Sequence, residues 1–172
     1  GEMDDVSLPD QQRVHYQFPG PAGQLFSGWR RYGYDGYGED IVSGEAYANG
    51  PGQSNTTGQR GRVWPFFSGE RGHYELAALL ARKAKAEPAD LAILRDKYVA
   101  ALEYFANEGL MLPEQVFDGV GATQVYQYQL GQGTSSATPL AWTHAEYIKL
   151  LRSLHDQKIW DQYPVVHQRY SQ

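Results

Sequence analysis

The chain has 172 residues, of which 41% are hydrophobic and 20% charged, with a formal net charge of −5. This is the composition of a folded domain, and the acidic balance argues against nucleic acid as the main partner because phosphate binding needs a concentrated basic surface. The absence of cysteine excludes disulfides and thiolate metal sites, and no apolar run reaches the roughly 20 residues that span a bilayer.

The first part of the chain, residues 1–62, is predicted to be mostly irregular. Gly and Pro occur repeatedly in it, and both residues favour turns over regular elements. Within it, Leu25 to Tyr32 is predicted as a short strand or extended segment that leads into a turn. Residues 44–62 are polar and rich in Gly, so we expect an exposed excursion there.

Three amphipathic helices are expected in the second part. The first covers about 70–86, and its apolar face holds Leu76, Leu79 and Leu80. The second covers about 88–107, with Pro88 in its first turn and Gly109 as a stop. The third begins with Thr138 as N-cap and Pro139 in the first position, with an apolar stripe of Tyr147, Ile148, Leu151 and Leu154. The regular pattern is all-α, and the tail after Gln157 is expected to lie back against the body.

Several kinds of site are excluded by their motifs. The glycine pairs in 119–121 and 131–133 lack the third Gly and the preceding strand of a dinucleotide fingerprint. Glu70-x-x-His73 occurs once, whereas a di-metal carboxylate bundle needs this motif twice. The five histidines are scattered, and each is interpreted as a surface or structural residue. We therefore predict no cofactor and no metal.

Glu114 is the candidate catalytic carboxylate. It follows Pro113, where a helix has ended and a Gly-rich loop begins. A general base needs a carboxylate that is held rigidly at a cavity wall, ionised near neutral pH, and close to one water. Pro113 fixes the local backbone, and the amide of Gln115 could hold the water or the carboxylate. On spacing alone, an ordinary solvated loop acid is the simpler interpretation.

Arg31, Asp35 and Trp64 are candidate substrate-binding residues, together with Gln115. Aromatic rings offer apolar faces to the C–H faces of a sugar, and Arg and Asp grip hydroxyls through charge-assisted hydrogen bonds. The alternative is a turn in which Asp35 bonds its own backbone and Arg31 forms a structural salt bridge. Trp64 is either a sugar platform or part of the core, and the core interpretation is the simpler one.

Four blocks of sequence together resemble one family. They cover residues 31–38, 61–76, 111–118 and 137–145, which include Arg-Tyr-Gly-Tyr-Asp-Gly-Tyr-Gly, Gly-Glu-Arg-Gly-His-Tyr-Glu-Leu, Leu-Pro-Glu-Gln-Val and Thr-Pro-Leu-Ala-Trp-Thr-His-Ala. In this order they resemble bacterial glucoamylases and glucodextranases of glycoside hydrolase family 15. The resemblance covers roughly residues 28–155.

The resemblance implies an (α/α)6 toroid with its active site in loops at one end, and inverting exo-hydrolysis that releases glucose from the non-reducing ends of α-glucans. Glu114 matches the general base, and its pKa is expected to be ordinary or lowered. Arg31 matches the arginine that contacts sugar, Asp35 the acid that supports the site, and Trp64 the tryptophan before the following helix. Trp142 is interpreted as supporting structure.

The resemblance also implies that this chain is one part of an enzyme. The family's general acid lies on loops that precede the Arg31 block, and three helices cannot close a toroid. Residues 1–172 are therefore interpreted as the C-terminal portion of a single catalytic domain, inactive alone, with the N-terminal portion as a partner, expected as a separate chain. The alternatives are a noncatalytic carbohydrate-binding module, an inactive remnant, a glucan transferase or a trehalase. A polymeric substrate suggests a secreted or periplasmic protein.

Overall fold

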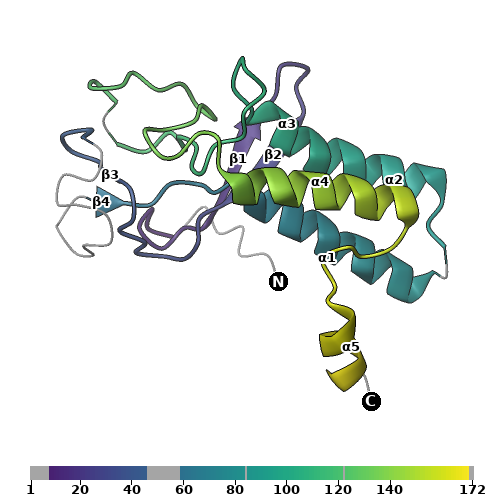
Figure 1. Ribbon diagram of the computed structural model, residues 1–172. Coiled ribbons are helices and arrows are strands. Elements are labelled where there is room, and N and C mark those ends of the chain that lie inside the picture. The colour runs from purple at the N-terminus through teal and green to yellow at the C-terminus, as the bar shows by residue number, and fades with distance from the viewer. Residues whose placement is uncertain (1–7, 46–58, 84, 122, 171–172) are drawn as a thin grey trace.

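The computed structural model describes residues 8–45, 59–83, 85–121 and 123–170. Its long helices lie together at one end of the molecule, and long loops extend from the other end (Figure 1). The helical elements are α1 (Phe66–Arg82), α2 (Pro88–Leu94), the π-helical turn η1 (Arg95–Val99), α3 (Ala100–Tyr104), α4 (Ala141–Asp156) and α5 (Pro164–Tyr170). The helical content agrees with the prediction, but the element bounds differ.

Helix α1 begins at Phe66 and ends at Arg82, so the predicted range of 70–86 was placed too late. Pro65 already has right-handed helical angles and opens the first turn, because proline needs no amide hydrogen there. The hydroxyl of Ser68 donates a 2.9 Å hydrogen bond to the carbonyl of Ser27 and ties this turn to the preceding segment. Lys83 is extended and ends the helix.

The second predicted helix is present as α2, η1 and α3 in direct succession. Pro88 lies in the first turn as predicted, behind a capping box formed by Glu87 and Asp90. The π-helical turn leaves the neighbouring residues Tyr98 and Val99 both buried. The helix ends at Tyr104 and therefore does not reach the predicted stop at Gly109.

Helix α4 begins at Ala141, so the predicted cap at Thr138 and first turn at Pro139 are wrong. The Thr138–Pro139 peptide is cis, and Leu140 is extended, with its amide donating to the carbonyl of Leu112 at 2.9 Å. The predicted apolar stripe is only partly buried, because Ile148 is 63% exposed. The buried face of α4 also holds polar residues, namely Thr143, Glu146 and Ser153.

Two small antiparallel sheets precede the helices. Strands β1 (His15–Pro19) and β2 (Leu25–Trp29) form a hairpin, and β3 (Glu39–Asp40) pairs with β4 (Gln59–Arg60). The strand expected from Leu25 is confirmed, and most of the described residues before 62 lie outside strands, as expected. Strands β1, β3 and β4 were not predicted, so the structure is mostly helical but not purely all-α. Strand β1 alternates between buried and exposed side chains over only five residues, which is too short a pattern to stand out in the sequence. The expected excursion at 44–62 falls mainly on 46–58, outside the described residues.

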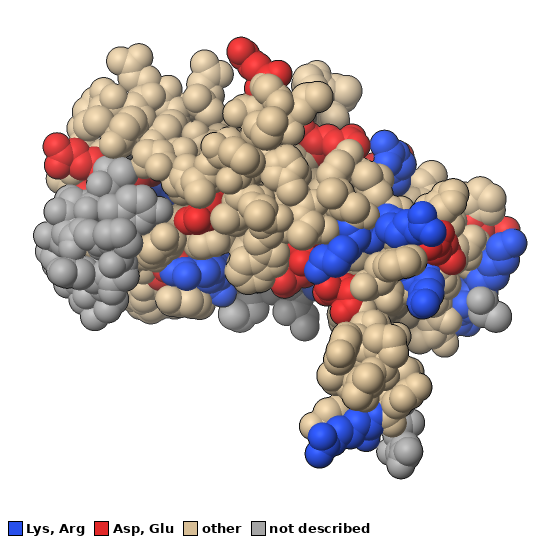
Figure 2. Space-filling view, in the orientation of Figure 1, with Lys and Arg blue, Asp and Glu red and all other residues tan. Residues whose placement is uncertain are grey.

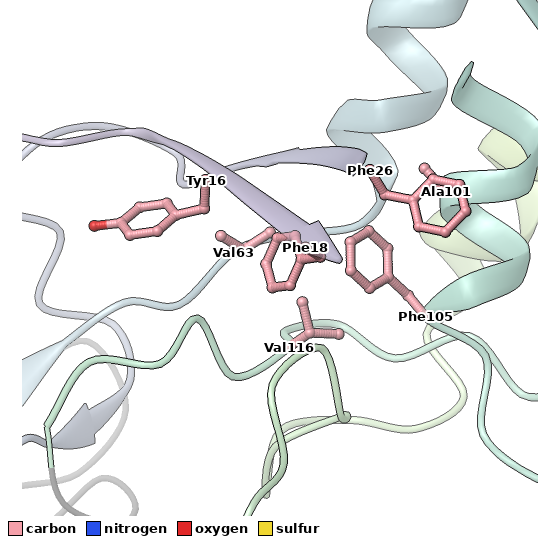
Figure 3. Close-up of a cluster of buried hydrophobic side chains, with 7 residues drawn as sticks. All are labelled: Tyr16, Phe18, Phe26, Val63, Ala101, Phe105 and Val116. Atoms are coloured by element: carbon pink, nitrogen blue, oxygen red, sulfur yellow. The ribbon is translucent and has the colours of Figure 1, made fainter. Parts of the chain in front are cut away.

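The hairpin, the helices and the loops share one hydrophobic cluster (Figure 3). The hairpin contributes Tyr16, Phe18 and Phe26, the α3 region contributes Ala101 and Phe105, and two loops contribute Val63 and Val116. The rings of Phe18 and Phe105 meet edge to face, with centroids 4.9 Å apart. A second cluster fills the space between the helices: Leu76, Leu94, Tyr98, Val99, Leu102, Leu150 and Leu154. The loops around Val63 and Val116 therefore rest on a packed base.

The C-terminal tail lies back against the body only in part. The amide of Trp160 donates to the hydroxyl of Ser153 at 2.9 Å, and Asp161 pairs with Lys149 on α4. Helix α5 has no buried residue and projects away from the other helices (Figure 1). On the face seen in Figure 2, acidic and basic side chains are interspersed over the helical end. Of the helices described, none combines the length and apolar character needed to cross a membrane.

Candidate functional site

Backbone bridges join the end of strand β2 and three loop segments. Trp29 pairs with Trp64, Val63 with Val116, and Val116 with Gly133, all antiparallel. These bridges bring segments that are far apart in sequence side by side, because each β-bridge holds two backbones within hydrogen-bond distance. The bridged segments contain or adjoin all the predicted site residues.

Glu114 is 9% exposed and lies in the segment that contains Val116. Its amide donates to the carbonyl of Ala137 at 2.8 Å, and the hydroxyl of Thr143 on α4 donates to the carbonyl of Pro113 at 3.0 Å. The backbone before and at Glu114 is therefore fixed on two sides. The solvated loop acid that spacing alone suggested is not what the structure shows.

The pKa of Glu114 is raised above its ordinary value of 4.5, chiefly because burial disfavours the charged carboxylate. A hydrogen bond from Gln115 and the positive charge of Arg31 lower the pKa, but these effects are smaller. The expectation of an ordinary or lowered pKa is therefore wrong for this structure. The hydrogen bond that Gln115 Nε2 donates to this carboxylate is long, at 3.4 Å, so it offsets only part of the effect of burial.

Gln115 is buried and joins three segments through its amide. Its Oε1 accepts a 2.6 Å hydrogen bond from the amide of Arg62, and its Nε2 donates to the carbonyl of Tyr37 at 3.1 Å and to Glu114 Oε1. Both amide hydrogens thus have acceptors within the protein. The geometry supports the predicted role of holding the carboxylate, and it leaves little capacity for the predicted contact with a sugar.

Arg31 and Asp35 form a bidentate ion pair. Arg31 Nε lies 2.8 Å from Asp35 Oδ2, and Arg31 Nη2 lies 2.7 Å from Oδ1. Asp35 is 1% exposed and also accepts a hydrogen bond from the amide of Tyr37, so the predicted turn with a structural salt bridge is present. The side chain of Arg31 remains 30% exposed. Of the two residues, only Arg31 is open to a ligand.

Trp64 is mostly core. It is buried, with its ring stacked beside Tyr37 and edge-on to Phe66, and the guanidinium of Arg31 lies 5.0 Å from its centroid. Its indole Nε1 has no hydrogen-bond partner among the described residues. Trp142, predicted as supporting structure, stacks on Phe66 with centroids 3.9 Å apart, yet it is half exposed. The more accessible aromatic surface therefore belongs to Trp142.

A buried charge network, which was not predicted, supports these loops. Asp118 accepts from Arg60 Nη1 at 2.5 Å and from Arg62 Nη1 at 3.1 Å, and Arg62 Nε also pairs with Glu39 at 2.9 Å. Arg62 has no exposed surface, so partners within the protein must compensate its charge, and the carbonyl of Val120 also accepts from its Nη1 at 2.6 Å. The partners are far apart in sequence, and no local spacing reveals them.

No group of three or more potential metal ligands gathers at Glu114 among the described residues. The one such group in that part of the chain consists of His73, Glu146 and Asp161, between α1 and the region of α4. The arrangement at Glu114 is instead a buried carboxylate beside a partly open guanidinium and aromatic rings. Such a site can act on a neutral polar ligand by proton transfer without a metal ligand set.

Comparison with known proteins identifies the family to which this chain belongs. Residues 8–152 match the glycosyl hydrolases family 15, and the chain therefore belongs to that family of glycoside hydrolases. Within it, the chain is 39% identical over 142 residues to a glucoamylase from Clostridium sp. (strain G0005), a match that covers 83% of this chain and 16% of the relative.

A solved structure gives the same result for the fold. The crystal structure of a bacterial glucoamylase complexed with acarbose matches with a TM-score of 0.60 and 35% identity, over 91% of this chain and 18% of that one. The chain thus corresponds to less than a fifth of the length of either glucoamylase. These findings confirm the resemblance seen in the sequence.

Proposed function

We propose that this chain is the base-bearing portion of an inverting, exo-acting α-glucan hydrolase, and that Glu114 is its general base. The observation that carries the proposal is the placement of Glu114, which is buried on a backbone fixed from two sides and acted on by the charge of Arg31. Burying an ionisable carboxylate with one long hydrogen bond costs stability, and such groups concentrate at functional sites.

The chemistry requires two carboxyl groups on opposite faces of the sugar. The general acid protonates the glycosidic oxygen as its bond to the anomeric carbon breaks, and a carboxylate about 6.5–9.5 Å away takes a proton from the attacking water. Burial makes Glu114 a stronger base than a solvated glutamate, because the protonated form is favoured. Gln115 orients the carboxylate through its Nε2 hydrogen.

Arg31 is proposed to contact the bound sugar with its exposed edge, while Asp35 acts through Arg31. Asp35 is buried behind the guanidinium and fixes its plane through two hydrogen bonds. Trp64 and Tyr37 lie against the guanidinium and limit its movement. This arrangement suits recognition of hydroxyl groups, since guanidinium donors lie in a fixed plane.

The rest of the active site is proposed to come from sequence outside these 172 residues. The chain matches 18% of the solved glucoamylase, and its helices cannot by themselves close an (α/α)6 toroid. The general acid and the remaining helices would be supplied by the N-terminal portion of the catalytic domain, in the same polypeptide or in a separate one. The chain alone is then inactive, and the polymeric substrate is consistent with an exported enzyme.

The experiment joins the chain to the remainder of its catalytic domain and measures hydrolysis of maltose and isomaltose. We expect Glu114→Gln to lower kcat by about 10²–10⁴-fold, the usual loss of a general base. Glu108→Gln, a change of an exposed acid in the same connection, is the matched control and should leave kcat unchanged. Proton NMR of the first product should show the β-anomer of glucose, as inversion requires.

Two results would overturn the proposal. If kcat of Glu114→Gln stays within a few-fold of the value for the unmodified domain, Glu114 is not the general base. A completed domain without activity, combined with glucan binding by the chain that Trp64→Ala weakens and Glu114→Gln leaves unchanged, would identify a noncatalytic binding module instead. Calorimetry with a maltooligosaccharide measures that binding.

A further inference from the structure

His73 on α1 and Glu146 on α4 face each other across the contact between these helices. His73 Nδ1 lies 3.8 Å from Glu146 Oε2, and the residues are 5% and 3% exposed. Neither of these two atoms has a hydrogen-bond partner among the described residues. Buried polar atoms are rarely left without hydrogen-bond partners, so the persistence of these two points to something that satisfies both.

The approach of the two helices is what brings these atoms together. Gly69 lies one turn before His73, and a Cβ there would lie 2.9 Å from the Cβ of Glu146. Any side chain at Gly69 would therefore push the helices apart. On the other side of the imidazole, His73 Nε2 lies 3.1 Å from the hydroxyl of Ser153, which fixes the ring so that Nδ1 is directed at Glu146.

A third potential ligand comes from the loop after α4. Asp161 offers a carboxylate oxygen that lies, with the ligand atoms of His73 and Glu146, in a group whose members are all within 4.8 Å of one another. The loop is held by the hydrogen bond from the amide of Trp160 to Ser153, the same hydroxyl that contacts the histidine. The position of Asp161 is therefore coupled to that of the ring.

The charges around this group do not balance. Lys149 Nζ lies 2.5 Å from Glu146 Oε1 and also pairs with Asp161. Glu70, half-buried on α1, is within electrostatic reach of both carboxylates. Three carboxylates thus share one ammonium group, Lys149. A divalent cation would add positive charge beside these carboxylates.

We propose that His73 Nδ1, Glu146 Oε2 and a carboxylate oxygen of Asp161 bind a divalent transition-metal ion of the zinc class. An imidazole nitrogen suits zinc and similar ions, whereas calcium and magnesium prefer oxygen ligands alone. Zinc bonds of about 2.0–2.2 Å place tetrahedral ligand atoms about 3.4 Å apart, so the 3.8 Å separation needs only a small closure. Ser153 fills the role of the partner that orients a metal-bound histidine.

This site is separate from the proposed catalytic residues, and it uses a motif that the sequence analysis set aside. Glu70-x-x-His73 occurs once, which excluded a di-metal bundle, and the histidines were interpreted as structural. The further ligands, Glu146 and Asp161, come from α4 and the loop after it, so the spacing of residues within α1 does not reveal them. The ion would link α1, α4 and this loop, and it would stabilise the helical end of the molecule.

The test is a titration of the untagged 172-residue chain, freed of metal with a chelator, with Zn²⁺ in a calorimeter. We expect one saturable site per chain. Glu146→Gln and His73→Gln, which keep side-chain size, should each weaken binding by at least about tenfold. Lys149→Gln should tighten it, because it removes the competing cation from two ligands. His155→Gln changes an exposed histidine beside Asp156 and should have no effect.

The absence of a saturable site would overturn the proposal, as would Zn²⁺ binding that survives in a folded Glu146→Gln variant. Weaker binding after Lys149→Gln, or loss of binding after His155→Gln, would also overturn it. If circular dichroism shows that the His73 and Glu146 variants do not fold, X-ray absorption at the zinc edge of the unmodified chain decides. One imidazole among oxygen ligands supports the site, whereas water ligands only, or several imidazoles, contradict it.

Discussion

The backbone amide of Arg62 donates a 2.6 Å hydrogen bond to the side-chain Oε1 of Gln115. The loop that precedes α1 thereby holds the residue next to the proposed base. The side chain of the same arginine pairs with Glu39 and Asp118, so one residue connects the β3 strand and both ends of the Gln115–Asp118 segment. The surroundings of Glu114 therefore depend on segments that are far from it in the sequence as well as on its neighbour Gln115.

Gln115→Leu should shift the pH dependence of catalysis. The hydrogen bond from Gln115 lowers the pKa of Glu114, so its loss raises that pKa further and protonates the base at higher pH. In the completed domain, the acidic limb of the kcat/KM profile should move to higher pH, and the plateau should fall by about 10–100-fold through misplacement of the carboxylate. Gln17→Leu, an exposed change on β1, is the control. An unshifted acidic limb would contradict this account.

Glu114→Gln should stabilise the chain near neutral pH. Because folding raises the pKa of Glu114, the folded state binds the proton more tightly than the unfolded state. The contribution of this proton binding to folding stability is present below pH 4.5 and is lost as pH rises through the raised pKa. Glutamine does not ionise, so the Glu114→Gln variant does not lose stability in this way as pH rises. Urea unfolding of both forms should show the variant gaining stability relative to the unmodified chain with increasing pH. A variant that is less stable near neutral pH would contradict the prediction.

Asp118→Asn should be strongly destabilising. It removes the negative charge that Arg60 and Arg62 share in a site without exposed carboxylate surface. Leaving buried cations uncompensated costs about 3–5 kcal/mol, and the urea midpoint should fall accordingly. Glu75→Gln breaks a more exposed pair with Arg71 on α1 and should cost about 0.5 kcal/mol or less. Equal losses of stability in the two variants would show that the buried network contributes no more to stability than an exposed ion pair.

Gly61→Ala should disturb the Arg31–Asp35 pair. A Cβ at residue 61 would lie 2.4 Å from Asp35 Oδ2, so the carboxylate or the backbone must move. We expect a loss of about 1–3 kcal/mol, typical of overpacking, together with a rise in KM of the completed domain as Arg31 loses its support. Gly109→Ala is the control, because its Cβ would lie 3.3 Å from the side-chain oxygen of Asn107 and 4.0 Å from Met111 Cγ. An unchanged KM would show that the Arg31–Asp35 pair does not contribute to substrate binding.

The helices could be predicted from the sequence because their apolar residues repeat with the helical period, but their ends could not. Pro65 opens α1, whereas Pro139 lies before α4, and the difference is set by tertiary contacts such as that between Leu140 and Leu112. Ile148 fits the apolar stripe of α4 and is nevertheless exposed, because polar residues occupy the buried face. Periodicity identifies a helix more reliably than it identifies the face that packs.

The parts of the candidate site that are local in sequence could be predicted, and the long-range parts could not. Arg31 and Asp35 are four residues apart, so their pairing follows from spacing, and Gln115 adjoins Glu114. The partners Arg62 and Asp118 are brought together by the bridges at Val63 and Val116. The raised pKa of Glu114 likewise depends on burial by remote segments, which the sequence does not reveal.

The long-range contacts between the loops also imply an order of events during folding. Thr143 anchors Pro113, Gln115 holds the amide of Arg62, and Arg62 in turn reaches Glu39. Contacts of such long range form late, since chain closure must be complete before they contribute. During synthesis, the carboxylate at 114 would therefore gain its full surroundings only after α4 has left the ribosome.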